Sequence, residues 1–388
     1  MMKKIISVLS SLLIVINLFA QDELHDELNT ITTGVPFLLI GTDARAGAMG
    51  DIGAATTPDV NSMHWNAAKF AFVENDLGVS ISFVPWLRAL VNDINLSYLT
   101  GYKKIGEQQA IGFELGYFSL GQITFTRSDG SLIGDYTPNE WVIGSAYSRK
   151  LSDYFSLSVG GKYILSDLTG NTHASGVPTT AGRSFAGDLS AFYTNPLRVS
   201  GKDIDFSLGA VISNIGSKIK YTETTTQDFI PINLRLATSF GTDIDDYNKI
   251  SLAFDFNKLL VPTPPYRNDD GEIISGMNPE VAVVEGMLQS FWDAPGGSKE
   301  EFREINYSLG TEYWYNDQFA LRGGYFNEHD TKGGRKYFTF GMGMKYTVYV
   351  IDFSYLINAN NNAGATNPLA NTMRFSLTWD FGGAKAAN

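Results

Sequence analysis

The alternation of apolar and polar residues with a period of two constrains this chain more than any other feature of its sequence. It begins at Leu77 and recurs almost to the end of the chain; the runs ISLAFDFN at residues 250–257 and MRFSLTWDF at residues 373–381 are examples. Successive side chains of a β-strand point to opposite faces. A period of two therefore indicates strands that each have one apolar and one polar face.

About fourteen such runs can be counted, each roughly ten residues long. They lie near residues 77–84, 92–102, 109–119, 140–149, 154–165, 184–194, 203–213, 232–241, 248–257, 304–314, 318–327, 336–346, 349–357 and 372–381. An even number of alternating segments of this length is the signature of an outer-membrane β-barrel. The sequence therefore predicts an all-β protein, in which residues 74–388 form an antiparallel transmembrane β-barrel of about 14 strands.

The connections between these runs alternate in length. Short polar gaps such as 150–153 and 315–317 are followed by longer ones such as 121–139, 166–183 and 258–303. Short periplasmic turns and longer external loops produce this alternation in bacterial barrels. We therefore expect the long connections outside the cell and, with an even strand count, both ends of the chain on the periplasmic side.

A soluble β-sandwich or propeller is the alternative fold, and its polar face would be exposed and strongly charged. Here the polar face consists mostly of Gly, Ser, Thr and Asn. The charges on it have both signs: Glu114, Asp188, Asp205, Asp255, Glu312, Asp352 and Asp380, and Lys162, Arg235, Arg322, Lys345 and Arg374. The other face carries aromatic residues near the strand ends, as the interfacial girdles of a barrel do. This mixture favours a narrow lumen with paired charges.

The first twenty residues have the pattern of a secretory signal peptide. Lys3 and Lys4 precede an apolar stretch at residues 5–19, and a plausible cleavage site follows Ala20. A transmembrane helix is the alternative, but the stretch is short and contains several Ser and Asn residues. Residues 1–20 are therefore predicted to be removed, and residues 21–33 to form an acidic periplasmic N-terminal tail.

The composition argues against several kinds of function. No cysteine is present, which excludes disulfides and thiolate catalysis. The chain has 29 Lys and Arg against 41 Asp and Glu. Without Lys3 and Lys4 the net charge is about −14, which argues against nucleic acid as a partner. The four histidines lack metal-ligand spacing, and no catalytic motif is recognisable. We predict no enzyme, no cofactor and no metal.

The segment before the first predicted strand, residues 34–73, lacks sustained alternation. It is rich in Gly and Ala but also contains large apolar residues such as Phe37, Trp65 and Phe70. Small residues permit close packing in a confined space, and the apolar content argues against a floppy linker. The segment is therefore predicted to fold into the lumen as a plug.

Two external connections contain apolar residues that need a covering surface. The first has its tip at Trp86, Leu87, Arg88 and Leu90. Such a tip could bury itself in the barrel mouth, enter lipid or insert into a partner.

The second connection spans residues 258–303. After Pro279 its spacing predicts an amphipathic helix that ends at residues 293–297. The apolar residues of this helix are Val281, Val284, Leu288, Phe291 and Trp292. Capping of its own barrel mouth and docking of a partner both remain open, so the two connections are candidate partner-binding sites.

Several runs of the sequence resemble one family of barrels. TDARAGAMGDIGAA at residues 42–55, followed by SMHWNAA at residues 62–68, resembles the plug of FadL-type outer-membrane barrels, with Ala67 in place of the usual proline. With VPWLR at residues 84–88 and YFSLG at residues 117–121, the chain resembles the PorV (LptO) family over essentially its whole mature length. The plug-motif residues to which this resemblance points are Asp43, Arg45, Gly47, Gly50, Trp65 and Asn66.

Resemblance to the PorV family implies an outer-membrane component of the type IX secretion system of Bacteroidetes. Such proteins associate with the giant translocon barrel, receive cargo through its C-terminal signal domain and pass it to the surface sortase/attachment complex. Resemblance to FadL-type barrels leaves open a channel for long-chain fatty acids or other hydrophobic compounds. A channel should show a continuous apolar track, whereas the predicted lumen positions are small, polar and ionic, which favours secretion.

Overall fold

The computed structural model describes residues 28–382 except 89, 127–128, 171–172, 175–176, 200, 223–226, 360–368 and 370–371. The predicted signal peptide, residues 1–20, and the first part of the predicted tail, residues 21–27, lie outside the described residues. None of the helices in the described ranges is both long and apolar enough to cross a membrane.

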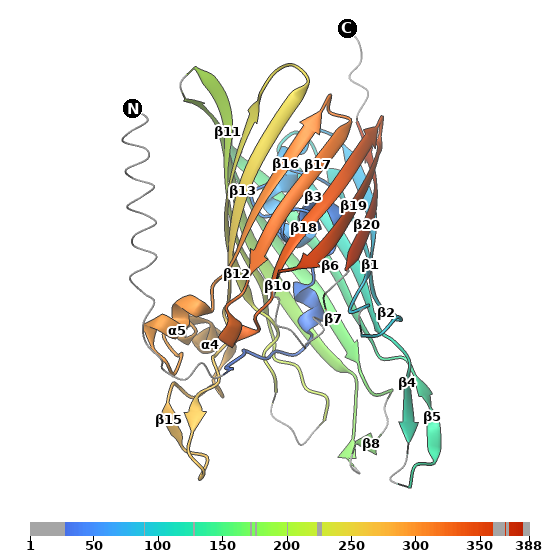
Figure 1. The fold of residues 1–388 in the computed structure, drawn as a ribbon, viewed down its shortest axis with the longest axis vertical. Helices are drawn as coiled ribbons and strands as arrows, with labels where there is room; N and C mark the ends of the chain where they lie inside the picture. Colours follow the sequence, from blue (N-terminus) through green and yellow to red (C-terminus); the bar gives the residue numbers. More distant parts are fainter. Residues whose placement is uncertain are drawn as a thin grey trace.

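Fourteen strands form one closed barrel, in which neighbouring strands are antiparallel and β1 pairs with both β2 and β20 (Figure 1). Their bounds are β1 Leu77–Pro85, β2 Ile94–Lys104, β3 Gln109–Leu120, β6 Asn139–Ser152, β7 Phe155–Asp167, β10 Gly182–Val199, β11 Lys202–Gly216, β12 Asn233–Asp243, β13 Asn248–Leu259, β16 Asn306–Tyr315, β17 Phe319–Asn327, β18 Lys336–Tyr346, β19 Tyr349–Asn358 and β20 Met373–Phe381. The predicted all-β barrel is confirmed, and each predicted run coincides with one strand to within a few residues.

The predicted faces of the strands are also as observed. On β20, Arg374 is 3% exposed whereas its neighbour Phe375 is 46% exposed. On β13, Asp255 is fully buried and Phe256 points outward. Because side chains alternate along a strand, the apolar residues cover the outer wall and the polar residues line the interior.

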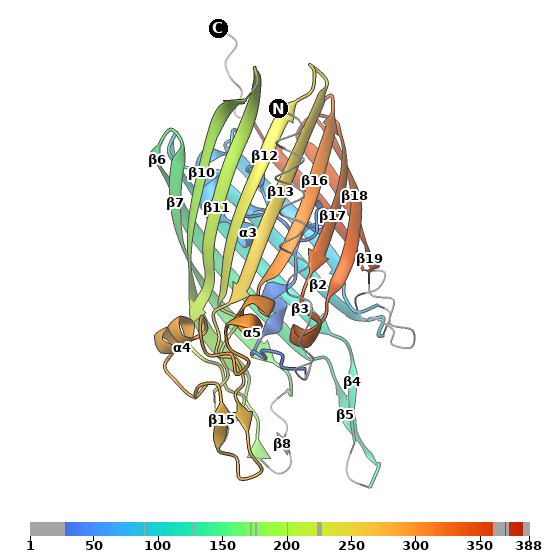
Figure 2. The ribbon, with the colours of Figure 1, turned by 60° about the vertical axis from the view of Figure 1, so that its left-hand side comes forward.

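The two ends of the barrel differ as the gap lengths predicted. At one end short hairpin turns connect neighbouring strands, and at the other end the connections are longer and contain small helices and strands of their own (Figures 1 and 2). These elements are β4 Ile123–Thr126, β5 Leu132–Tyr136, β8 His173–Ala174, β9 Val177–Pro178, β14 Tyr266–Arg267, β15 Ile273–Ser275, α4 Val283–Gln289, α5 Ser298–Arg303 and η4 Asp330–Lys332. We call the end with long connections the outer end, because long loops face outside in bacterial barrels.

The segment between the tail and β1 runs along the inside of the barrel, where it is drawn in blue in Figure 1. It contains only short helices: η2 Pro36–Leu39, α2 Ala44–Gly47, α3 Ser62–Trp65 and η3 Ala67–Phe72. Most of its residues between 34 and 73 are buried. We call residues 34–73 the inner segment.

The predicted periplasmic position of residues 21–33 is wrong for the described part, residues 28–33. The backbone N–H of Asn29 donates to the carbonyl of Thr331, and its side-chain amide donates to Glu300 and to the carbonyl of Pro264. All three partners belong to connections of the outer end. The reason is that the inner segment runs the length of the lumen, so a chain that reaches β1 at the periplasmic end has entered at the outer end.

Candidate functional site at the outer end of the barrel

Small hydroxyl residues of the barrel wall bind the backbone of the inner segment. The hydroxyls of Ser148 and Ser156 donate to the carbonyls of Ala67 and Ala68, at 2.6 and 2.7 Å. At the other side of the barrel the hydroxyl of Thr339 donates to the carbonyl of Ala48 at 2.9 Å. A backbone buried without regular secondary structure needs such partners. The Ser- and Thr-rich inner face of the strands supplies them.

Glycines allow the wall and the inner segment to approach closely. A Cβ atom at Gly310 would lie 2.4 Å from the carbonyl oxygen of Met49, and one at Gly324 would lie 2.1 Å from the carbonyl carbon of Met49. Gly50, a plug-motif residue, has a φ of +76° that favours glycine. A Cβ at Gly47 would collide with the side chain of Arg374. The glycines of the motif therefore serve contact with the wall.

Arg45 is the main ionic contact between the inner segment and the wall. Its guanidinium donates to both carboxylate oxygens of Glu312 on β16, at 2.9 and 2.7 Å, and to Asp59 at 2.9 Å. Glu312 also pairs with Arg322, which in turn pairs with Asp352, each at 2.6 Å. In this buried network, charges of both signs are paired within the lumen.

The remaining plug-motif residues hold the inner segment to itself and to the wall. The carboxylate of Asp43 caps α2 at the N–H of Ala46 and accepts from the indole N–H of Trp65 at 2.5 Å. The amide of Asn66 donates to the carbonyls of Ala54 and Ala191, at 2.8 and 3.0 Å. The resemblance therefore pointed to residues that organise this segment.

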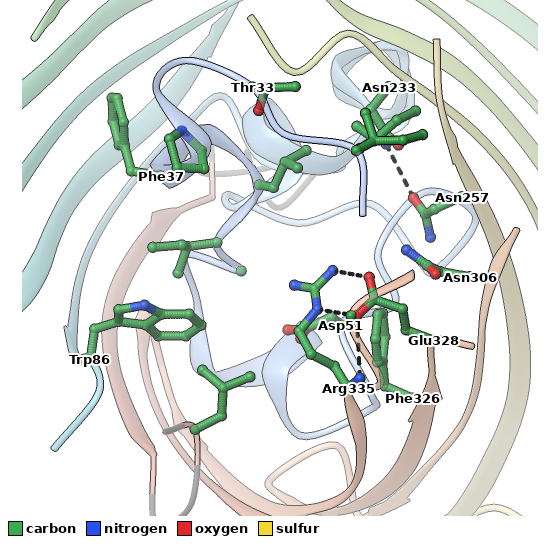
Figure 3. A pocket seen from close by; sticks show the side chains of 18 of the residues that line it. Thr33, Phe37, Asp51, Trp86, Asn233, Asn257, Asn306, Phe326, Glu328 and Arg335 are labelled. Atoms are coloured by element: carbon green, nitrogen blue, oxygen red, sulfur yellow. Dashed lines mark hydrogen bonds and ion pairs between the residues drawn. The ribbon is translucent and has the colours of Figure 1, made fainter. Parts of the chain in front are cut away.

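A cavity of about 590 Å³ lies at the outer end of the lumen, against the first residues of the inner segment. Figure 3 shows Phe37 and Trp86 on one side and a row of asparagines on the other. The apolar residues of the lining are Phe37, Ile40, Trp86, Leu87, Ile94, Phe118, Leu120, Phe326, Leu356 and Leu369. The polar residues of the lining include Thr32, Thr33, Asn233, Arg235, Asn257, Glu304, Asn306, Glu328, Lys332 and Arg335. We call the side with Phe37 and Trp86 the apolar wall and the side with the asparagines the polar wall, although Phe326 lies beside Glu328 and Arg335. A volume of this size is typical of ligand pockets.

The structure separates the residues of the predicted apolar tip. Trp86 and Leu87 are half-buried and pack against Phe326, Tyr337 and neighbouring core residues, so they form part of the cavity wall. Arg88 and Leu90 are exposed. Of the three interpretations of this tip, burial in the barrel mouth therefore describes Trp86 and Leu87.

The predicted helix in residues 258–303 exists but is shorter than expected, since α4 spans only Val283–Gln289. Val281 packs inward against a cluster of buried apolar residues that includes Phe229 and Ile230. The other predicted apolar residues are exposed: Val284 66%, Leu288 58%, Phe291 45% and Trp292 61%. Phe291 and Trp292 lie in the turn after the helix, so the apolar spacing continues beyond it. Phe302 on α5, which the sequence analysis missed, is also exposed, and we call these five residues the outer apolar surface.

A buried polar cluster attaches this connection to the barrel. Lys258 pairs with Glu301 at 3.0 Å and with Glu304 at 2.6 Å, and Lys332 pairs with Glu300 at 2.5 Å. Burial raises the pKa of Asp293 beside them to about 6, although its carboxylate accepts from the N–H of Thr263. The cluster fixes the connection at the rim of the cavity.

Arg235 lines the cavity, as its predicted place on the inner face of its strand allows, but its sequence context gave no sign of a site there. Alternation identifies an inward-facing charge, but it does not say whether that charge has a partner.

Across the described ranges, no group of three or more His, Cys, Asp or Glu side chains is arranged to hold a metal ion.

Solved structures that are similar to this chain include a channel, a transporter and a FadL homologue. The "CymD monoaromatic hydrocarbon channel" has a TM-score of 0.51 and 14% identity, with 89% of this chain and 99% of that chain covered. The toluene transporter TodX of Pseudomonas putida has a TM-score of 0.47 and 10% identity over 91% and 98% of the two chains. A FadL homologue of Pseudomonas aeruginosa has a TM-score of 0.45 and 11% identity over 91% and 99%. At 14% identity the first similarity shows a shared fold.

No curated protein sequence matches this chain significantly. A family model does: "Type IX secretion system protein PorV" matches residues 23–266, well over half of the chain. The match includes the whole inner segment and the strands from β1 to β13. The chain therefore belongs to the PorV family of type IX secretion system proteins, and it is an outer-membrane β-barrel that shares its fold with the CymD channel.

Proposed function

We propose that this protein is the cargo-binding barrel of a type IX secretion system. It receives the C-terminal signal domain of a cargo protein from the giant translocon barrel. It then passes the cargo to the sortase/attachment complex at the cell surface. Membership of the PorV family supports the pathway, and the cavity at the outer end supports binding from outside. Binding and transfer need no catalytic residue, and we assign none.

The observation that carries this proposal is that the lumen beyond the cavity is occupied. Below Phe37 the inner segment is buried and held by the Arg45–Glu312 ion pair and by hydroxyl groups of the wall. We assign residues 34–73 the role of a plug. A plug retained in this way favours a receptor that acts at its outer end over a conduit through the barrel.

We assign the outer apolar surface to the contact with the translocon barrel. It comprises Val284, Leu288, Phe291, Trp292 and Phe302, all well exposed on a connection that the buried polar cluster holds in place. Several large exposed apolar groups on one connection are typical of an interaction site. Trp is among the residue types that dominate interface energy.

The test is affinity purification of the tagged protein from its native outer membrane, with and without Trp292→Ala. A tryptophan at the centre of an interface contributes about 2 kcal/mol or more, so recovery of the translocon barrel should fall roughly 30-fold. The matched control is Leu132→Ala, another exposed apolar residue of an outer connection. Equal recovery from both variants would contradict the assigned surface. Absence of any translocon component from the unaltered sample would contradict the proposed function.

A channel for hydrophobic compounds is the second candidate, and the apolar wall of the cavity favours it. The CymD channel, whose title names monoaromatic hydrocarbons, has the same fold. In that case lipid vesicles containing the purified protein should take up radiolabelled oleate faster than empty vesicles. Uptake equal to that of empty vesicles, together with recovery of the translocon, would rule out this candidate.

A further inference from the structure

Almost every charged group that lines the outer cavity has a partner of opposite charge. Glu304 pairs with Lys332 at 3.0 Å, and Arg335 pairs with Glu328 at 2.8 Å. Asp51, at the inner side of the cavity, pairs with Arg374. The cavity lining is therefore electrically balanced at these positions.

Arg235 is the exception. Its side chain reaches from β12 into the cavity, and its Nε donates to the side-chain oxygen of Asn257 at 2.7 Å. Within the part of the chain that the structure describes, its two Nη atoms have neither a hydrogen bond nor an ion pair. Asp255 on the neighbouring strand interacts with Arg235 electrostatically but forms no ion pair with it in the described residues; its Oδ2 instead accepts from the N–H groups of Gly53 and Ala54, at 3.3 and 3.4 Å.

The surroundings of Arg235 hold its guanidinium in a defined orientation. It lies over the ring of Trp65, with its central carbon 4.6 Å from the ring centroid. Asn257 accepts from both Arg235 and Asn233 through the same oxygen, so the three side chains are linked. A half-buried guanidinium that is fixed on one side and unpaired on the other favours a planar anion at its free edge.

The two walls of the cavity restrict what kind of molecule would carry this anion. The polar wall offers the amides of Asn233, Asn257 and Asn306 and the hydroxyl of Thr33 (Figure 3). A hydrocarbon tail could not use these groups, whereas a polypeptide main chain has N–H and C=O groups that need partners once buried. The apolar wall, with Phe37 and Trp86, suits side chains that alternate with that main chain.

We propose that the outer cavity binds the last residues of a polypeptide chain, with the terminal carboxylate held by Arg235. The two free Nη groups make a bidentate contact with the carboxylate, and the amide of Asn257 is close enough to support it. The main chain follows the polar wall, and apolar side chains pack on the opposite wall. This inference rests on the proposed function, because it names the part of the cargo that this protein would recognise.

The test uses the purified full-length protein in detergent and a fluorescein-labelled peptide of the last eight residues of a type IX cargo signal domain. The same peptide with a C-terminal carboxamide is the matched probe. Charge-assisted hydrogen bonds to a buried partner are strong, so the free acid should bind about 10-fold or more tightly than the carboxamide. Arg235→Gln should abolish this difference. The control Arg267→Gln, which removes the same charge from an outer connection, should preserve it.

Three results would overturn the inference. They are equal binding of acid and carboxamide to the unaltered protein, an unchanged preference in Arg235→Gln, and binding of cis-parinaric acid to the cavity in the absence of peptide binding. The comparison of the two peptides needs no variant, so it stands even if Arg235→Gln fails to fold. Binding of the whole signal domain is measured in parallel. If the domain binds regardless of its terminal group, only this inference fails; if it does not bind, the proposed function fails as well.

Discussion

Replacing Arg45 should loosen the inner segment without unfolding the barrel. The Arg45 side chain is 12% exposed and contacts Glu312, which is 4% exposed, and Asp59. Removal of one partner from a buried ion pair costs about 3–5 kcal/mol. Glu312 keeps its pair with Arg322 in the variant. The cost of Arg45→Ala should therefore lie near the lower limit, about 3 kcal/mol, which corresponds to roughly a 100-fold change in a local opening equilibrium.

Hydrogen–deuterium exchange followed by mass spectrometry measures this local opening directly. Peptides from residues 42–68 should exchange roughly 100-fold faster in Arg45→Ala, while peptides from β7 and β13 should exchange as before. The matched control is Lys249→Ala, which removes an exposed pair with Asp317 at the periplasmic end. An exposed pair contributes about 0–1 kcal/mol, so this control should change little.

A second readout is the conductance of the reconstituted protein in a planar bilayer. If residues 34–73 block the lumen, the Arg45→Ala variant should show more frequent conducting events than the unaltered protein. Unchanged exchange in residues 42–68 would refute the argument that this ion pair holds the segment. Faster exchange with no added conductance would show that the segment is loosened without acting as a plug.

Three further predictions follow from the wall, the cavity and the outer connection. Leu377→Arg places a charge at the middle of a lipid-facing strand at a cost of about 2–4 kcal/mol, so it should block assembly on a heat-modifiability gel, whereas Leu377→Met should assemble; equal assembly would mean that the assigned faces are wrong. Trp86→Ala should lower the free energy of unfolding by about 2 kcal/mol because Trp86 packs in the cavity wall. Leu90→Ala, which alters an exposed residue of the same connection, should change the free energy of unfolding by no more than about 0.5 kcal/mol. Equal heat resistance of the two variants would contradict this. The pKa of Asp293 is raised from 3.8 to about 6, so the folded connection binds this proton more tightly than the unfolded chain and loses stability as the pH rises between these values. Asp293→Asn should therefore make the protease resistance of residues 258–303 equal at pH 5 and pH 8. A difference that persists in this variant would mean that another group causes the pH dependence.

The strands and their faces could be predicted from the sequence because a barrel wall separates two different environments. Lipid outside and a packed polar interior inside impose opposite requirements on successive residues. This requirement acts on each residue separately, so the face of each residue can be predicted without knowing which strands pair. The positions of Arg374 and Phe375 on opposite faces illustrate it.

The plug-motif residues could be named from resemblance, but their partners could not. Arg45 lies 267 positions from Glu312 in the chain, and no local pattern connects the two. The same limit applies to Trp86, which packs against the cluster that contains Phe326 and Tyr337. Apolar residues at a loop tip have the same local pattern whether they face water, lipid or their own protein.

The sequence by itself therefore determined the fold class, the strand count, the two faces of the wall and the family resemblance. Only the tertiary structure decided that the chain enters at the outer end, that Trp86 lines a cavity, and that Arg235 forms no ion pair with any carboxylate of the described residues. The physical reason is that alternation depends on the environment of single residues. Cavities and charge pairing instead depend on which distant residues closure of the barrel brings together.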